Sequence, residues 1–351
     1  MQTKMQFRPI SHSWVAVHPN PQGVIQFIGG AFFGTFGPMF FYRFLLQSLF
    51  DSGYTIVILP FNFTFNHYVE AGFLIKEQYA ILPELVRIAS RTPGYKYDIY
   101  LKETNFYWLG HSIGCKYISL LEGFSALPEN EQDREKFIQN LVKKNAEAVI
   151  ADIEVLIQQL QWEIKQAIEL IKVYTGKEIT INNIFIKNQE SVLLAPVNSG
   201  TESAIPQPIA GIVDALGLGV KPTPSLTFDL IKKSNLFNLL GVVSFRADKI
   251  AKSTVQWFEE TFAKPKTADG KANPYYRPDF NNYWLKDQRG GHLRPLGLRV
   301  GNTVINFPDF FRIPLFESAN QRFQGFEFLV IQLLQDVKKK GLESEKKSSQ
   351  H

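Results

Sequence analysis

One serine of the chain stands between two glycines in a pattern typical of hydrolytic nucleophiles. The segment "FYWLGHSIGCKY", residues 106–117, contains Gly110, Ser112 and Gly114 as a G-x-S-x-G motif. A serine hydroxyl attacks a carbonyl carbon only when a base removes its proton and hydrogen-bond donors stabilise the oxyanion that forms. This motif holds the serine on a sharp turn between a strand and a helix. Ser112 is therefore the candidate nucleophile; the alternative is a serine that only caps the helix.

A histidine later in the chain should supply the base, because in this motif an acid and then a histidine follow the serine in sequence. Of the six histidines, His292 and His351 lie far enough downstream, and His351 is the last residue. His292 lies in "RGGHLRP", where two glycines would let its imidazole enter a cleft. The alternative is a surface histidine without a role. His111 directly precedes the serine, and we expect its ring to point away from the hydroxyl across the turn.

The acid is expected at the end of the strand that precedes this histidine. In "LLGVVSFRADKIA", Asp248 follows an apolar run and precedes a helical pattern. Its carboxylate would accept the Nδ1–H of His292 and stabilise the imidazolium. Alternatively, Asp248 is only the N-cap of the next helix. Asp279 and Asp287 are weaker candidates for the acid.

Backbone N–H groups from two loops would complete the site as an oxyanion hole. Ile113 follows the serine at the amino terminus of a helix, where free N–H groups and the helix dipole favour negative charge. The second donor should come from the loop after an early strand. The segment "IGGAFFG", residues 28–34, occupies that place. Its glycines free the backbone to present the N–H of Ala31 or of Phe32.

Aromatic residues gather in the segments expected around this site. The chain has 30 phenylalanines, and several lie in residues 31–36 and in "FNFTFNH", residues 61–67. We expect Gly30, Phe63 and His111 to line the substrate pocket. The aromatic residues favour a substrate with an apolar acyl or alcohol part, and the alternative is that most of them belong to the core.

The elements that must position these residues alternate between strands and helices, which predicts βαβ units and a mostly parallel sheet. "SWVAVH" and "GVIQFIG" flank turn residues 19–22 and suggest a hairpin. A helix is expected over residues 70–90 with a kink or break at Pro83, and a final helix over about 318–339. The expected strands, "GVIQFIG", "YTIVILPF", "NFYWLG", "SVLLAPV" and "LLGVVSF", are rich in apolar residues, as strands buried on both faces are.

Residues 1–340 are expected to form a single domain with two insertions, followed by a disordered, charged tail at 341–351. Residues 127–187 have apolar residues at helical spacing and predict two long amphipathic helices or one bent helix. This insertion should emerge away from the site and serve as a stabilising or partner-binding element. Residues 198–238 follow the end of a strand at the mouth of the site and are the candidate lid.

The composition excludes several classes of protein. With 45% hydrophobic and 20% charged residues, the 351-residue chain can bury a large core. A net charge of +5 without a cluster of basic and aromatic residues argues against nucleic-acid binding. One cysteine and scattered histidines give no metal-ligand spacing, so neither a metal nor another cofactor is expected. The uncharged run at 23–42 contains five glycines and a proline, so we expect no transmembrane segment there, and the absence of a signal peptide predicts a cytoplasmic protein.

These motifs together resemble those of the α/β-hydrolase superfamily, and more narrowly those of an uncharacterised family from cyanobacteria and plant plastids. The similarity rests on "IGGAFFG", "GHSIGCK", "SFRADKIA" and "GGHLRP" and extends over about residues 12–335. The resemblance implies an esterase, lipase or thioesterase activity with Ser112, Asp248 and His292 as the triad. Gly29 replaces the histidine of a His-Gly pair found in many members, which leaves the oxyanion donor open.

The sequence therefore predicts a serine hydrolase that cleaves an ester or thioester through an acyl-enzyme on Ser112. Its substrate would be a small-molecule or lipid-like ester, and peripheral membrane contact is compatible with the sequence. Two alternatives are an acyltransferase and a non-catalytic protein of this fold that serves in binding or assembly. The sequence leaves the oligomeric state open.

Overall fold

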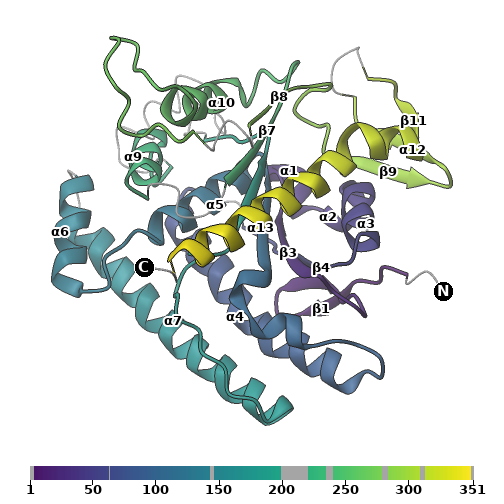
Figure 1. Ribbon diagram of the computed structural model, residues 1–351, viewed down its shortest axis with the longest axis horizontal. Coiled ribbons are helices and arrows are strands. Elements are labelled where there is room, and N and C mark those ends of the chain that lie inside the picture. Colours follow the sequence, from purple (N-terminus) through teal and green to yellow (C-terminus); the bar gives the residue numbers. More distant parts are fainter. Residues whose placement is uncertain are drawn as a thin grey trace.

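A computed structural model describes seven stretches of the chain (Figure 1): residues 4–62, 64–142, 146–198, 220–234, 240–278, 284–308 and 313–348. Its centre is an eight-stranded sheet with the order β1-β2-β4-β3-β5-β6-β7-β8. Strands β3 to β8 run parallel, and β1 and β2 form an antiparallel edge. This order and these directions are those of the α/β-hydrolase fold, and the predicted fold class with a mostly parallel sheet is confirmed. The strands are β1 (Arg8–Ile10), β2 (Ser13–Ala16), β3 (Gly23–Ile28), β4 (Tyr54–Ile58), β5 (Phe106–His111), β6 (Ser191–Leu194), β7 (Leu240–Phe245) and β8 (Trp284–Gln288).

The predicted hairpin of β2 and β3 is wrong, because β4 lies between these two strands. Strand β4 pairs antiparallel with β2 and parallel with β3. All five residues of β4 are buried and apolar or β-branched, so the strand is most stable with a neighbour on both sides. The turn residues at 19–22 resemble a hairpin connection, but they carry the chain across the width of one strand.

Helices cover both faces of the sheet and bury a separate core on each (Figure 1). One face packs against α3 (Arg43–Asp51) and α13 (Phe328–Ser348). The other packs against α4 (His67–Arg91), α5 (Ile113–Phe124) and α7 (Ala146–Thr175). Strands β3 to β6 are buried throughout, and the parallel pairing of β5 to β8 brings the carboxyl ends of β5, β7 and β8 to one edge of the sheet.

The helical insertion consists of two helices, α6 (Glu131–Leu141) and α7. Helix α7 buries one apolar stripe, which includes Ile153, Leu160 and Ile171, against the core on the side of α4. Helix α7 therefore covers the flank of α4, and α6 packs on α7 (Figure 1).

Helix α4 continues through Pro83 as one helix, so of the predicted kink or break the break is absent. A proline inside a helix costs about 3 kcal/mol, but α4 is buried along much of its length, including Pro83 itself, and this packing maintains the helix. Helix α13 likewise runs on to Ser348, so residues 341–348 are helical and not a disordered tail. Lysine and glutamate dominate this segment, and both are good helix formers.

The predicted lid range 198–238 is described only in part. Its residues 220–234 contain α9 (Pro224–Ser234), which packs on α5, while residues 199–219 and 235–238 lie outside the described residues. Near the carboxyl terminus, β9 (Gly297–Val300) and β10 (Thr303–Asn306) form a hairpin around Gly301, and β11 (Phe316–Ser318) pairs with β10.

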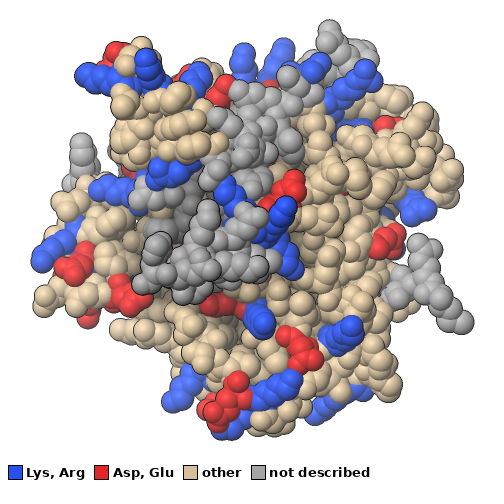
Figure 2. Space-filling view, in the orientation of Figure 1, with Lys and Arg blue, Asp and Glu red and all other residues tan. Residues whose placement is uncertain are grey.

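The uncharged run at 23–42 folds as β3 followed by two short helices, α1 (Ala31–Thr35) and α2 (Pro38–Phe41). Among the described helices, none has the length and hydropathy needed to span a bilayer. Figure 2 shows Lys and Arg side chains interspersed with Asp and Glu over the described part of the face that it draws.

Candidate active site

Ser112 lies on a strained turn between β5 and α5. Its backbone angles are φ 56° and ψ −121°, a region that residues other than glycine rarely adopt. Such a conformation costs about 1–2 kcal/mol. Ser112 occupies the N-cap position of α5, but its side chain makes no capping hydrogen bond to the described backbone of this helix, so the hydroxyl is left for another partner.

The two glycines of the motif are required by the close contact of strand and helix. A Cβ at Gly114 would lie 2.3 Å from the carbonyl oxygen of Ile28, and a Cβ at Gly110 would lie 2.9 Å from the backbone nitrogen of Cys115. Because both distances are shorter than real Cβ contacts, any other residue would push α5 away from the sheet and move the serine.

The structure brings the three predicted triad residues together at the carboxyl edge of the sheet. Nε2 of His292 lies 2.7 Å from Oγ of Ser112, and Nδ1 of His292 lies 2.9 Å from Oδ2 of Asp248. The side chains of His292 and Asp248 are 9% and 3% exposed, so water screens their interaction little. This geometry suits proton transfer from the serine hydroxyl to the imidazole.

Asp248 is not the N-cap of the next helix, α10 (Lys252–Phe258), because the N-cap position is Ala251 and no side chain caps it; the alternative role from the sequence is therefore wrong. Oδ2 of Asp248 faces the imidazole, while its Oδ1 accepts hydrogen bonds from the backbone N–H groups of Ile250 and Ala251 at 2.8 and 2.9 Å. These two bonds fix the orientation of the carboxylate, because each oxygen has a different set of donors.

The candidate oxyanion donors line one cavity together with Ser112. Gly30, Ala31, Phe32 and Ile113 all contribute to its wall. Ala31 and Phe32 begin α1 and Ile113 begins α5, so their N–H groups belong to first helical turns, where the helix itself supplies no acceptor.

The cavity beside Ser112 has a volume of about 300 Å³ and a mainly apolar wall. Of the predicted pocket residues, Gly30 and His111 line it, and Phe63 lies outside the described residues. Three exposed apolar side chains from separate segments form its rim: Phe32, Phe65 and Ile250 are 59%, 38% and 61% exposed. Further wall residues are Phe33, Phe61, Tyr117, Val197, Val220 and Leu293.

His111 does not point away from the site as expected. Its ring lies beside that of His292, with centroids 5.2 Å apart, and its Nε2 is 2.8 Å from the carbonyl oxygen of His292. Burial and the neighbouring His292 lower the pKa of His111 to about 3. The ring is therefore neutral at pH 7.

Sequence reasoning missed two buried residues near the site. The hydroxyl of Tyr42 lies 2.7 Å from Nδ1 of His111, and no motif marks this tyrosine. His67 also lines the cavity, and burial and the neighbouring Lys116 lower its pKa to about 3. The one sequence signal for His67 is its position at the end of an aromatic segment, just before a helical pattern.

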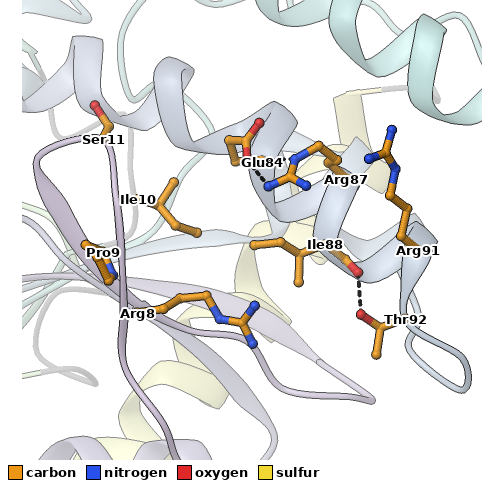
Figure 3. A pocket seen from close by; sticks show the side chains of 9 residues that line it. All are labelled: Arg8, Pro9, Ile10, Ser11, Glu84, Arg87, Ile88, Arg91 and Thr92. Carbon is orange, nitrogen blue, oxygen red and sulfur yellow. Dashed lines mark hydrogen bonds and ion pairs between the residues drawn. The ribbon is translucent and has the colours of Figure 1, made fainter.

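A second cavity, of about 470 Å³, is unrelated to the triad (Figure 3). It lies between β1 and the carboxyl-terminal end of α4, where Arg87 is paired with Glu84 at 2.6 Å. His67 begins the same helix, so at 1.5 Å per residue this cavity is about 30 Å along α4 from the catalytic one.

Comparison with known proteins returned one family and several solved structures. Residues 6–160 match the model of a family described as "Protein of unknown function (DUF1350)". The search of curated proteins returned no match. Esterase B from Lactobacillus rhamnosis is 11% identical, with a TM-score of 0.44 over 95% of this chain and 84% of that chain. A thermophilic esterase from the planctomycete Thermogutta terrifontis is 10% identical, with a TM-score of 0.42 over 95% of this chain and 94% of that chain. The thioesterase domain from the curacin biosynthetic pathway is 11% identical, with a TM-score of 0.28 over 82% and 93%.

Proposed function

We propose that the protein is a serine hydrolase that cleaves an ester or thioester through an acyl-enzyme on Ser112. The observation that carries this proposal is the hydrogen-bonded series of Ser112, His292 and Asp248, at 2.7 and 2.9 Å, built on a serine with a strained backbone. Strain of this kind persists only where the surrounding structure enforces it, and it is typical of functional sites.

In the first step His292 Nε2 takes the proton of the serine hydroxyl as Oγ attacks the substrate carbonyl carbon. Asp248 Oδ2 accepts the Nδ1–H of the imidazolium that forms and holds the ring in place. The N–H of Ile113 and the N–H of Ala31 or Phe32 stabilise the oxyanion. The imidazolium then protonates the leaving alkoxide or thiolate, and an acyl group remains on Oγ.

In the second step water attacks the acyl carbon, and His292 again accepts a proton. Collapse of the tetrahedral intermediate releases the carboxylic acid and restores the serine hydroxyl. Asp248 Oδ2 holds the imidazole in both steps, while the N–H groups of Ile250 and Ala251 keep its carboxyl group in position.

The cavity supports a substrate with an apolar part. Its wall consists mainly of aromatic and aliphatic side chains, and its volume of about 300 Å³ lies at the lower end of the usual range for ligand sites, about 300–1,000 Å³. A short acyl group fits such a space better than a long one. The exposed rim of Phe32, Phe65 and Ile250 would contact the remainder of a lipid-like ester.

A fluorophosphonate probe tests this proposal directly. The wild type should become labelled at one site, and Ser112→Ala should remain unlabelled while unfolding at a similar temperature. Hydrolysis of p-nitrophenyl butyrate should disappear in the same variant. Equal labelling of both proteins, or none of the folded wild type, would contradict the assignment of Ser112 as nucleophile.

A further inference from the structure

Three buried hydrogen bonds connect the oxyanion loop to the loop of the catalytic histidine. The backbone nitrogen of Gly30 lies 2.8 Å from the hydroxyl oxygen of Tyr42, and this oxygen lies 2.7 Å from Nδ1 of His111. Nε2 of His111 lies 2.8 Å from the carbonyl oxygen of His292. Tyr42 and His111 are 0% and 1% exposed. The series therefore joins the loop after β3 to the loop after β8, two segments that are distant in sequence.

The direction of each hydrogen bond follows from the chemistry of the groups. A carbonyl oxygen only accepts, so Nε2 of His111 carries the proton that it donates to His292. Because His111 is neutral, its Nδ1 is a bare acceptor and the hydroxyl of Tyr42 donates to it. The tyrosine oxygen in turn accepts the N–H of Gly30. Every donor of the series thus has an acceptor, and the tautomer of His111 is determined.

Gly30 packs against this series without spare room. A Cβ at this position would lie 3.0 Å from Nδ1 of His111, 3.2 Å from Cβ of Ser112 and 3.3 Å from the hydroxyl oxygen of Tyr42. The oxyanion loop thus rests on the nucleophile and on the hydrogen-bonded series at once. Since the N–H of Gly30 is bound to Tyr42, the next N–H groups of the loop are those that can face a substrate oxygen.

We propose that Tyr42 and His111 are positioning residues that hold the oxyanion loop and the catalytic histidine in register with Ser112. This inference rests on the proposed function and adds two residues to its site. His111 restrains the backbone of His292, which places the imidazole at hydrogen-bonding distance from the serine. Tyr42 restrains Gly30, which sets the direction of the following peptide group.

Separate variants test the two ends of the series. Tyr42→Phe removes the hydroxyl that binds Gly30. His111→Gln keeps a donor near the position of Nε2, whereas His111→Asn keeps an acceptor near Nδ1 and loses the donor to His292. Tyr107→Phe is the matched control, because Tyr107 is also fully buried and its hydroxyl has no partner among the residues described.

The proposal predicts a loss of kcat with little change in KM, since the apolar wall of the cavity stays intact. For p-nitrophenyl butyrate we expect kcat to fall about 10-fold in Tyr42→Phe and about 10- to 100-fold in His111→Asn, as for the loss of one buried hydrogen bond. His111→Gln should retain more activity than His111→Asn, and Tyr107→Phe should match the wild type. Because both residues belong to one series, the double variant Tyr42→Phe/His111→Asn should lose less than the product of the two single losses.

Two results would overturn the proposal: kcat within twofold of the wild type in folded Tyr42→Phe and His111→Asn, or an equal loss in the Tyr107→Phe control. A second measurement does not depend on activity. Long-range ¹⁵N NMR of the histidine rings should find His111 protonated at Nε2 alone at pH 7, and Tyr42→Phe should shift its Nδ1 resonance. Protonation at Nδ1 would contradict the series even if the wild type hydrolysed no ester, whereas an inactive wild type with the expected tautomer would contradict only the proposed function.

Discussion

Replacement of Asp248 by asparagine tests the proposed triad more sharply than removal of the nucleophile, because it changes one atom. In the wild type, Oδ1 accepts two backbone N–H groups and Oδ2 accepts the Nδ1–H of His292. Asparagine has one oxygen and one NH2 group to place at these two positions. The oxygen must occupy the Oδ1 position, because an NH2 group there would face the N–H groups of Ile250 and Ala251 and forfeit two hydrogen bonds, about 1 kcal/mol each.

The NH2 group of Asp248→Asn then points at Nδ1 of His292 and makes this nitrogen an acceptor. The imidazole proton moves to Nε2, which faces the hydroxyl of Ser112, and the ring in this tautomer cannot take the serine proton. We therefore expect kcat for p-nitrophenyl butyrate to fall by about 10⁴-fold. The free energy of unfolding should stay close to that of the wild type, because the backbone bonds to Ile250 and Ala251 are retained.

The assay is steady-state hydrolysis combined with the rate constant for fluorophosphonate labelling and with chemical unfolding. Asp248→Ala is the informative comparison: it also loses the two backbone bonds, so it should be destabilised by about 1–2 kcal/mol in addition to its loss of activity. If folded Asp248→Asn kept kcat within tenfold of the wild type, the aspartate would not control the tautomer of His292 and the proposed mechanism would be wrong.

Two further predictions concern stability. Glycine tolerates a positive φ, so the free energy of unfolding of Ser112→Gly, measured with a denaturant, should exceed that of the equally inactive Ser112→Ala by about 1 kcal/mol. Equal free energies would show that the turn at Ser112 is not strained. Burial lowers the pKa of His67 and of His111 from 6.5 to about 3, so the unfolded chain binds more protons than the folded chain between these two values. The free energy of unfolding should therefore fall as the pH drops below 6.5, by up to about 1.4 kcal/mol per pH unit for each histidine. Urea unfolding at several pH values between 6 and 4 measures this dependence, and the free energy of unfolding of His67→Phe should fall less steeply with decreasing pH than that of the wild type.

The sequence predicted the three side chains of the proposed triad because their spacing follows from backbone geometry. A serine between two glycines, directly after an apolar run, predicts a sharp turn from a strand into a helix. The glycines are needed there because the helix passes within contact distance of the sheet at Gly110 and Gly114. The parallel strands then bring the residues that follow their carboxyl ends to one edge. Asp248 and His292 could be identified from their position after a strand and their order in the chain.

Strand pairing and helix continuity were harder to predict, because both depend on partners that are distant in sequence. The residues of β2 and β3 and the turn between them have the local pattern of a hairpin, but β4 pairs with both strands and separates them. Pro83 disfavours a helix locally, and the packing of α4 along the sheet and α7 maintains it. In each case tertiary contacts outweigh a correct local preference.

His111 and Tyr42 show why the proposed positioning residues could not be read from the sequence. The sequence predicted that His111 points away from Ser112 across the turn, and adjacent residues of a regular strand do face opposite sides. The strained turn at Ser112 breaks this alternation, and the ring of His111 lies against the catalytic loop instead. Tyr42 stands 69 residues before His111, between α2 and α3, in a segment whose sequence is typical of an apolar core. A hydrogen bond between two such residues becomes visible only when β3 and β5 are paired, because that pairing sets the loop at Gly30 beside the turn at Ser112. The same pairing makes the oxyanion loop and the nucleophile one packed unit, so a change at Tyr42 should act on catalysis although its side chain touches no substrate atom.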